Sequence, residues 1–289
     1  TEGQAKWDKL VAQMKERGKG KTYDCIIGVS GGTDSSYLLH IAHKAGIRVL
    51  AVNLDNGWSS DISVRNIKKV TGALNIDLET YVIDYEEVKN VLVSYIKAGL
   101  PWIDGPTDMA IKAILFGMAS REGIKYVLNG ADFRSEGKQP MDWTYGDAYQ
   151  FKKVYQQFGR GKLKTYPRMT GYKQLYYSLF KKIKMNRPLY YLEYNKPSAQ
   201  KLLEEKYDWE YYGGHHHENI FTKFAIAFWL PKKFNIDKRI ITLSAQVMSG
   251  DLDRDAALAE SVRQRDHDVD QMYNALFREF LTFMMEDPR

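Results

Sequence analysis

The sequence predicts an α/β protein with a doubly wound parallel sheet, and three observations support this prediction. Apolar segments rich in β-branched residues alternate with segments of helical periodicity along the first half of the chain. This alternation is typical of parallel strands joined by helices that cover both faces of the sheet. Apolar runs such as residues 49–52 suit strands that are buried on both sides. The first strand also leads directly into a glycine-rich turn at residues 30–35, followed by a helix.

The expected elements follow one another in a regular order. An amphipathic helix over residues 4–17 precedes a glycine and lysine linker at 18–21. Strands are predicted at 23–29, 48–54, 78–83 and 126–129, and the helical patterns at 34–44, 61–71, 85–97 and 108–121 separate them. Further helices are expected at 172–185, 197–206, 218–230, 238–248, 254–265 and 268–285. We therefore expect a sheet domain with its N-terminal helix over 1–147, and a mostly helical region over 148–289 that contacts substrate or a partner.

The composition limits the class of protein. With 289 residues, of which 44% are apolar, the chain is long enough to bury a core. No apolar run reaches the roughly 18 residues of a membrane span, and no secretory signal is visible, so a cytoplasmic location is expected. Cys25 is the only cysteine, which excludes internal disulfides and cysteine-based zinc sites. The first residue is Thr1 rather than Met, which leaves open whether an upstream segment was removed.

The turn at residues 30–35, Ser-Gly-Gly-Thr-Asp-Ser, carries the strongest functional signal. Glycines allow the backbone to adopt positive φ angles and to approach a ligand closely. The amides at the start of the next helix point outward, and the helix dipole favours an anion there. Ser30 and Ser35 add hydroxyl donors. The expected ligand is a phosphate or a pyrophosphate, and the alternative is a serine-rich tight turn before an ordinary helix.

This turn resembles the PP-loop of the ATP pyrophosphatases, in which Ser-Gly-Gly-X-Asp-Ser grips the pyrophosphate of ATP. The resemblance implies an adenine nucleotide alpha hydrolase-like fold and a reaction in which ATP adenylates a carbonyl-type oxygen. It assigns the pyrophosphate cradle to Ser30, Gly31, Gly32, Thr33, Asp34 and Ser35. A Rossmann dinucleotide fold is the competing assignment, but its G-x-G-x-x-G signature does not follow the first strand.

The carboxyl ends of the other strands supply further candidates. Val52, Asn53 and Leu54 are expected to line the adenine, with plain core packing as the alternative. Gly130 would allow close approach of ATP, and Asp132 is a candidate Mg²⁺ ligand, with a simple turn as the alternative. Asp34 is a second candidate Mg²⁺ ligand and a candidate catalytic residue, although a carboxylate in a first turn also complements the helix dipole. Glu136 is a weaker candidate on the next loop.

The C-terminal half resembles the N-acetyl sugar amidotransferase family. The resemblance is carried by Leu-Tyr-Tyr-Leu-Glu-Tyr-Asn-Lys at 189–196, Tyr-Tyr-Gly-Gly-His-His-His-Glu-Asn at 211–219, and segments at 221–224, 230–239, 243–244, 249–250 and 254–258. It extends from about Trp7 to Leu258. It implies an enzyme of surface-polysaccharide biosynthesis, such as that of lipopolysaccharide O-antigen. The enzyme would use ATP and Mg²⁺ to convert an acetamido group on a nucleotide-linked sugar into an acetamidino group, with release of AMP and pyrophosphate.

The chain matches the family at two further positions and departs from it in two places. His216 and Glu218 match family positions, which implies a substrate-binding or catalytic role, with a helix cap at the surface as the alternative. Members often carry Lys inside the loop, where this chain has Thr33, so another residue or Mg²⁺ must neutralise charge near the phosphates. The cysteine-rich, zinc-binding segment that members carry ahead of the Trp7 region is missing, through truncation or divergence.

The source of ammonia follows from the cysteine content. Glutamine hydrolysis generally needs a cysteine nucleophile, and Cys25 lies inside the first predicted strand, where it should be buried and inert. We therefore expect a separate glutaminase subunit as a partner, which the family resemblance also implies.

A basic stretch leaves alternatives open. Residues 148–192 contain eleven Lys or Arg, no Asp or Glu, and eight tyrosines, in a chain of net charge +6. The stretch suits a nucleic-acid surface, a nucleotide-sugar diphosphate pocket or a solvated face that docks an acidic partner, and we favour the last two. A PP-loop tRNA-modifying enzyme of the thiolase type is thus one alternative function. A non-catalytic nucleotide-binding module is another.

Overall fold

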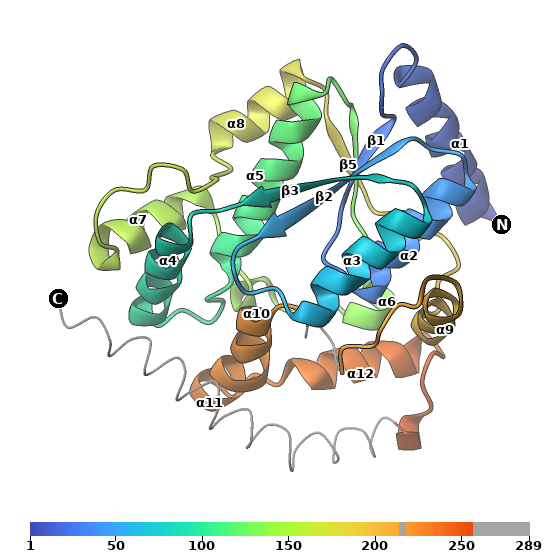
Figure 1. Cartoon of the computed structure of the whole chain (residues 1–289). Helices are drawn as coiled ribbons and strands as arrows, with labels where there is room; N and C mark the ends of the chain where they lie inside the picture. Colours follow the sequence, from blue (N-terminus) through green and yellow to red (C-terminus); the bar gives the residue numbers. More distant parts are fainter. Residues whose placement is uncertain (214–217, 257–289) are drawn as a thin grey trace.

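The computed structural model describes residues 1–213 and 218–256, and its centre is a five-stranded, wholly parallel sheet (Figure 1). The strand order is β3-β2-β1-β4-β5. The strands are β1 (Cys25–Gly28), β2 (Val49–Asp55), β3 (Asp77–Val82), β4 (Tyr126–Leu128) and β5 (Lys184–Asn186). The predicted α/β fold with a parallel sheet is confirmed.

The helices are distributed along the whole described chain. In order they are α1 (Glu2–Arg17), α2 (Thr33–Lys44), α3 (Asp61–Ala73), α4 (Tyr85–Ala98), α5 (Gly105–Arg121), α6 (Phe133–Glu136), α7 (Ala148–Phe158), α8 (Gly171–Leu175), α9 (Lys196–Tyr207), α10 (Ile220–Phe224), α11 (Leu230–Phe234) and α12 (Lys238–Met248). Short 3₁₀ turns occur at η1 (Met141–Trp143) and η3 (Pro188–Tyr190), and π-helical turns at η2 (Tyr176–Phe180) and η4 (Ala225–Trp229). Within the described residues, no helix is both long and apolar enough to cross a membrane.

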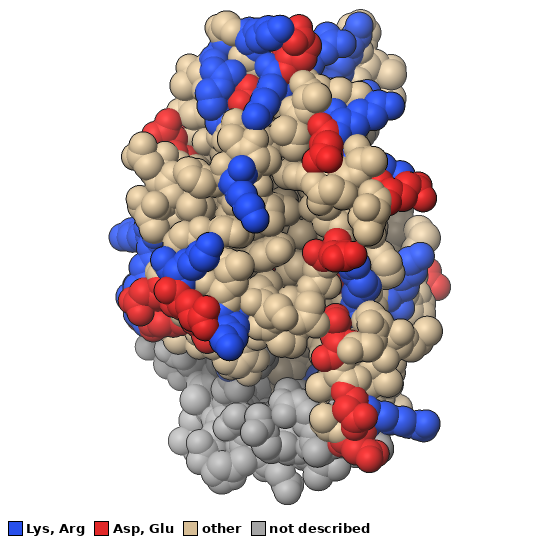
Figure 2. Space-filling view, turned by 90° about the vertical axis from the view of Figure 1, so that its right-hand side faces the viewer, with Lys and Arg blue, Asp and Glu red and all other residues tan. Residues whose placement is uncertain are grey.

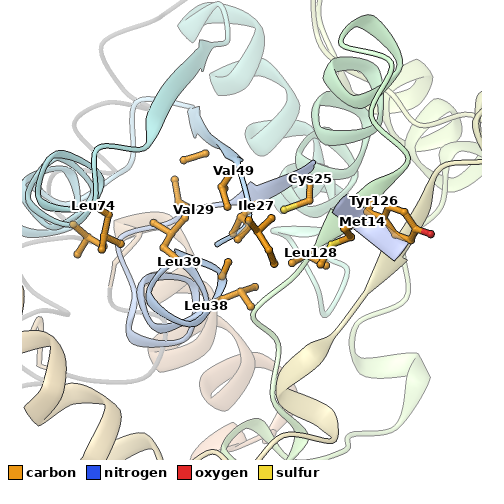
Figure 3. Packing of buried hydrophobic residues seen from close by; sticks show 14 of the residues in the cluster. Met14, Cys25, Ile27, Val29, Leu38, Leu39, Val49, Leu74, Tyr126 and Leu128 are labelled. Carbon is orange, nitrogen blue, oxygen red and sulfur yellow. The ribbon is translucent and has the colours of Figure 1, made fainter. Parts of the chain in front are cut away.

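The central strand β1 is buried on both faces because its side chains alternate between two cores. Cys25 and Ile27 pack with α1, α2 and α3 on one face (Figure 3). Ile26 points to the other face and packs with α5, where Leu115 and Phe116 are buried. This alternation is the reason why an unbroken apolar run, rather than an alternating one, encodes a central parallel strand.

One predicted helix is wrong in its second half. A helix was expected over 172–185, but the chain forms α8 and η2 up to Phe180 and then turns into β5. Met185 pairs with Val127 of β4, so the segment adds a strand to the edge of the sheet. Without β5, strand β4 would be the edge of the sheet, and its outward amides and carbonyls would lack partners. Pairing with β4 therefore outweighs the helical pattern of the segment.

Residues beyond 147 contribute a strand to the sheet and helices that pack on earlier helices. Because β5 belongs to the sheet, the sheet takes one of its strands from beyond residue 147, and the domain division expected there stays a prediction. Helix α9 packs on α2, and α12 packs on α6. The helix expected at 218–230 continues to Phe234 through a π-helical turn. The helices expected at 254–265 and 268–285 lie outside the described residues, apart from 254–256.

The basic, tyrosine-rich stretch forms α7, α8, η2 and β5. Tyr172, Leu179 and Phe180 of α8 and η2 are strongly exposed, and the Lys181 ammonium lies 5.5 Å from the centre of the Tyr176 ring. On a different face, the side on which α1 lies, basic and acidic side chains are interspersed (Figure 2). Part of the stretch is therefore exposed to solvent, and the choice among its three interpretations stays a prediction.

Candidate functional site

The loop after β1 is braced by its own serine side chains. The Ser30 amide donates to the Ser35 Oγ at 3.3 Å, and the Gly32 amide donates to the Ser30 Oγ at 3.4 Å. The Ser35 hydroxyl in turn donates to the Gly32 carbonyl at 3.2 Å. The two hydroxyls predicted as ligand donors thus also fix the shape of the turn.

Gly31 is required by the backbone and by its neighbour. Its φ is +79°, and a Cβ atom at this position would lie 2.2 Å from the carbonyl oxygen of Ser63 on α3. The Gly31 carbonyl accepts hydrogen bonds from Trp209 Nε1 at 3.0 Å and from Asn66 Nδ2 at 3.4 Å. No side chain fits this close approach, so the loop and α3 are held in contact through glycine.

Gly130, at the end of β4, makes a second close approach. A Cβ atom there would lie 2.9 Å from the backbone carbon of Asp34 and 3.0 Å from the Ser35 amide nitrogen. The contact therefore packs the end of β4 against the first turn of α2. Whether Gly130 also faces ATP stays a prediction.

Asp34 accepts hydrogen bonds from two residues that sequence reasoning missed. The Tyr194 hydroxyl donates to Asp34 Oδ1, and the Lys196 ammonium donates to Oδ2 at 3.0 Å. The Lys196 and Asp34 side chains retain only 14% and 17% of their exposure. Both new residues lie in segment 189–196, which carried the family resemblance, and this was the available signal.

The surroundings of this pair raise the pKa values of Lys196 and Tyr194. Burial lowers the pKa of the Lys196 ammonium, but the charge and the hydrogen bond of Asp34 raise it more, so the net shift is upward. Burial and the Asp34 charge both raise the pKa of the Tyr194 hydroxyl. At neutral pH the site therefore contains an ammonium group and a neutral phenol beside the Asp34 carboxylate.

The C-terminal half reaches the loop through Tyr212 and Glu218. The Thr33 amide donates to the Tyr212 hydroxyl at 3.3 Å, and the Ser30 hydroxyl donates to Glu218 Oε1 at 3.5 Å. Burial, followed by the Glu218 charge, raises the pKa of the Tyr212 hydroxyl. The predicted residue Glu218 is thus placed beside the loop, whereas His216 lies outside the described residues.

Backbone pairing fixes the position of Glu218. The Ser60 amide donates to the Glu218 carbonyl at 2.9 Å, and the Ile220 amide donates to the Trp58 carbonyl at 2.8 Å. A bridge of the antiparallel type joins Ser59 to Asn219. The segment that follows β2 therefore holds the start of the C-terminal helices over the loop.

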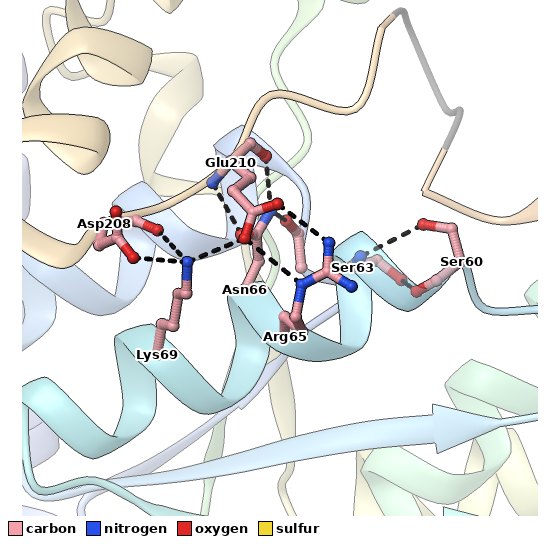
Figure 4. Close-up of polar contacts among 8 residues, drawn as sticks. Ser60, Ser63, Arg65, Asn66, Lys69, Asp208 and Glu210 are labelled. Atoms are coloured by element: carbon pink, nitrogen blue, oxygen red, sulfur yellow. Dashed lines mark hydrogen bonds and ion pairs between the residues drawn. The ribbon is translucent and has the colours of Figure 1, made fainter.

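A network of charges on α3 holds the segment that leads to Tyr212 (Figure 4). Arg65 and Lys69 each contact the Glu210 carboxylate at 2.9 Å, and Lys69 also contacts Asp208 at 2.7 Å. Asn66 completes the attachment by bonding the Glu210 carbonyl and amide, each at 2.8 Å. Hydrogen bonds from Arg65 and Lys69 lower the pKa of Glu210 to about 2.

Asp132 is fully buried and has two protein partners. Its carboxylate accepts from the Ser135 amide at 3.0 Å, which caps α6, and from Arg134 Nε at 3.2 Å. Arg134 also donates to the carbonyls of Leu189 and Leu192. Within residues 1–213 and 218–256, no cluster of three or more His, Cys, Asp or Glu side chains has the arrangement of a metal site.

The predicted adenine-lining residues occupy the end of β2. Val52 and Leu54 pack in the apolar cluster on the α5 face, and Asn53 is buried. Glu136, at the end of α6, is close enough for its charge to raise the pKa of Lys196. An adenine contact for the β2 residues stays a prediction.

Together, the fold and the loop define a class of protein. A parallel sheet whose central strand runs through a glycine-containing turn into a helix N-terminus is the architecture of α/β proteins that bind nucleotide phosphates.

Two family models match separate parts of the chain. Residues 24–99 match the model described as queuosine biosynthesis protein QueC, and this range includes the loop. Residues 218–287 match the model described as LPS biosynthesis protein WbpG-like, C-terminal domain. With the Ser-Gly-Gly-X-Asp-Ser motif, these matches support a protein of the PP-loop superfamily with a WbpG-like C-terminal region.

Solved structures with a related arrangement are distant in sequence. The NH3-dependent NAD synthetase from Campylobacter jejuni is 14% identical, with a TM-score of 0.43 over 92% of this chain and 94% of that chain. The NMN synthetase from Francisella tularensis is 14% identical, with a TM-score of 0.37 over 81% of this chain and 94% of that chain. These values are too low to carry an argument about function.

Two curated relatives share only short segments. A homologue of the phosphate-specific transport system accessory protein PhoU from Rhizobium meliloti is 61% identical over 31 residues, which is 11% of this chain and 13% of that protein. A homologue of the same protein from Deinococcus radiodurans is 35% identical over 71 residues, or 24% of this chain and 33% of that protein. The chain thus spans a third or less of these relatives, and so short a match shows no common function.

Proposed function

We propose that the protein is an ATP-dependent amidotransferase that converts an acetamido group of a nucleotide-linked sugar into an acetamidino group. It would act in the biosynthesis of lipopolysaccharide O-antigen or another surface polysaccharide. One observation carries the proposal. Glu218, the first residue of the WbpG-like match, contacts Ser30 of the phosphate loop. This contact joins the segment that suggests the sugar-related role to the site that suggests ATP.

The chemistry requires activation because an amide is a poor electrophile. The acetamido oxygen attacks the α-phosphorus of ATP, pyrophosphate leaves, and an O-adenylyl imidate forms. Ammonia then attacks the imidate carbon, and AMP leaves with the former amide oxygen. The protein must hold the triphosphate, align the acetamido oxygen with it and exclude water.

The residues of the loop suit the first task. The amides of the first turn of α2, together with those of Gly31 and Gly32, are the candidate donors to a pyrophosphate, which would replace the Ser30 and Tyr212 hydroxyls as acceptors at Gly32 and Thr33. Glu218 lies beside the loop and is our candidate to accept a proton from the attacking ammonia. His216 is a second candidate in the adjoining segment.

Mg²⁺ would enter with the nucleotide. Mg²⁺ in nucleotide enzymes is usually bound by phosphate oxygens, waters and one or two carboxylates. Asp34 and Asp132 are the predicted carboxylates, but each is paired with a cation in the structure, Lys196 and Arg134. As paired here, Asp34 and Asp132 thus form no ready-made metal site.

Ammonia must come from outside the chain. Cys25 is fully buried in β1, and burial raises the pKa of its thiol strongly, so a thiolate nucleophile does not form there. We propose that a separate glutaminase delivers the ammonia. Release of ammonia from glutamine by the purified chain alone would contradict this part of the proposal.

The decisive experiment follows the product by mass. A panel of UDP-linked N-acetyl sugars is incubated with ATP, Mg²⁺ and ammonium, and we expect AMP, pyrophosphate and a sugar whose mass has dropped by the exchange of oxygen for NH. The Asp34→Asn variant should lose this activity, whereas the surface variant Asp8→Asn on α1 should retain it. Absence of any mass shift across a broad panel would count against the proposal.

One alternative is a PP-loop enzyme of the thiolase type that modifies tRNA. The basic stretch is compatible with it, but such thiolases usually need additional cysteines, and the chain has one buried cysteine. Filter binding of tRNA at moderate salt separates the two functions. Pyrophosphate release that requires both a nucleotide sugar and ammonia would separate the amidotransferase from a non-catalytic nucleotide-binding module.

A further inference from the structure

The phosphate loop itself has no positive charge. Residues 30–35 contain one carboxylate, Asp34, and neither Lys nor Arg. At the position of Thr33 a neutral hydroxyl accepts a hydrogen bond from Gln200 at 3.3 Å. A bound pyrophosphate carries several negative charges, and backbone amides supply only partial positive charge. A cation beside this loop, either Mg²⁺ or a side chain from another part of the chain, is therefore needed to balance the charge.

Lys196 occupies the required position. It is the first residue of α9, and its ammonium reaches across to Asp34 in the first turn of α2. That turn also contains the Thr33 amide, so the ammonium lies beside the turn whose amides we propose as anion donors. Arg134, the cation paired with Asp132, is already committed to the Asp132 carboxylate and to two backbone carbonyls.

The buried ion pair is itself informative. Withdrawing an ammonium and a carboxylate from water is expensive, and an apolar pair of similar volume is often as stable. A buried charge pair is therefore weak evidence for a purely stabilising role. The Lys196 ammonium has donors to spare, because an ammonium offers three hydrogen bonds and Asp34 Oδ2 takes one.

We propose that Lys196 is the phosphate-binding cation of this loop. Asp34, which also accepts a hydrogen bond from the Tyr194 hydroxyl, holds the Lys196 ammonium at the first turn of α2, where it contacts the pyrophosphate part of a bound nucleotide. The inference rests on the proposed function only in taking a nucleoside triphosphate as the ligand.

Binding of inorganic pyrophosphate, measured by calorimetry, tests this role without any sugar. Loss of one charge-assisted contact should weaken binding about tenfold to hundredfold in Lys196→Gln. Lys201→Gln is the matched control, because Lys201 lies on the same helix, is 77% exposed and is 3.9 Å from Glu205. This control should bind as tightly as the wild type.

A relocated charge provides the sharper arm of the test. Thr33→Lys places an ammonium in the loop, so the double variant Thr33→Lys/Lys196→Gln should recover most of the lost affinity. Because Lys196→Gln leaves Asp34 without its cation, the variant Asp34→Asn/Lys196→Gln serves as a folded, neutral version of the pair. It should bind pyrophosphate as weakly as Lys196→Gln.

The proposal would be overturned if Asp34→Asn/Lys196→Gln or Lys196→Gln bound pyrophosphate as tightly as the wild type. Lys196 would then be only an ion-pair partner of Asp34. Failure of Thr33→Lys to restore binding in a folded double variant would also overturn it. The proposed sugar chemistry is tested separately. Pyrophosphate binding that depends on Lys196, without amidination of any sugar, would leave this inference standing and remove the function.

Discussion

Two charged attachments flank the phosphate loop, and they differ in exposure. On the α3 side, Arg65, Lys69 and Glu210 form an ion-pair network in which the Arg65 and Glu210 side chains keep 50% and 40% of their exposure. On the α9 side, Lys196 and Asp34 form a pair that is largely withdrawn from water. Exposed pairs contribute little to stability, whereas a buried pair is costly to break on one side only. The comparison indicates that the α3 network positions the segment that leads to Tyr212, whereas the Lys196–Asp34 pair acts at the loop.

The largest expected effect comes from breaking the buried pair. Lys196→Met leaves the Asp34 carboxylate without its cation, and we expect a loss of about 3–5 kcal/mol in the free energy of unfolding. Urea denaturation measures it. The double variant Asp34→Leu/Lys196→Met removes both charges and should recover most of the loss. A single variant as stable as the wild type would show that the pair is not shielded from water.

Gly31 tests the contact between the loop and α3. Gly31→Ala combines a positive φ with a Cβ atom 2.2 Å from the Ser63 carbonyl, so we expect a loss on the order of 2–4 kcal/mol. Gly20→Ala is the matched control, because Gly20 has a similar φ of +74° and no atom near the added Cβ. Thermal unfolding of both variants separates backbone strain from the clash. Equal losses would rule out a close contact between the loop and α3.

Breaking the exposed network should have a smaller effect. Glu210→Gln removes the charge that Arg65 and Lys69 share, but Asn66 still holds the backbone of residue 210. We expect little change in the urea midpoint and a modest loss of protection of the Tyr212 amide in hydrogen exchange. A loss of stability comparable to that of Lys196→Met would reverse the ranking of the two attachments.

The two attachments should also respond to opposite extremes of pH. The pKa of Glu210 is lowered from 4.5 to about 2, so its contribution is complete above pH 4.5 and is lost as the pH falls through about 2. The pKa of Lys196 is raised above 10.5, so its contribution is complete below pH 10.5 and is lost only at higher pH. Unfolding of the wild type, Glu210→Gln and Lys196→Met across pH checks both directions. Parallel profiles for the wild type and Glu210→Gln below pH 4.5 would contradict the acid half.

Much of the fold could be predicted from sequence because its signals are local. The strand, turn and helix around residues 25–44 follow one another without a gap, so apolar patterning and glycine placement suffice. Strand β5 was missed because the alternation of polar and apolar residues over Lys184, Met185 and Asn186 is too short to stand out from the helical pattern before it. These residues become a strand through pairing with β4.

The candidate site could be predicted from the sequence only where its residues lie close together along the chain. The loop residues lie within one short segment, and Glu218 was found through family resemblance. The partners of Asp34 were missed because Tyr194 and Lys196 are 160 and 162 positions away, and no periodicity connects them. Thr33 stands where family members often carry Lys, and the sequence therefore predicted that another group supplies the missing positive charge. Only the packing of α9 on α2 identifies a candidate for that group.

The hydroxyl of Tyr212 has a consequence for how tightly the loop can hold any anion. It accepts the hydrogen bond of the Thr33 amide, which is one of the donors that a phosphate would use. A phosphate and the Tyr212 hydroxyl therefore compete for the Thr33 amide proton. The observed binding free energy of the phosphate is reduced by the free energy of the hydrogen bond to Tyr212. In the proposed function, the Tyr212 hydroxyl is thus an intramolecular competitor of the phosphate, and the attachment of residues 208–212 to α3 holds it at the loop.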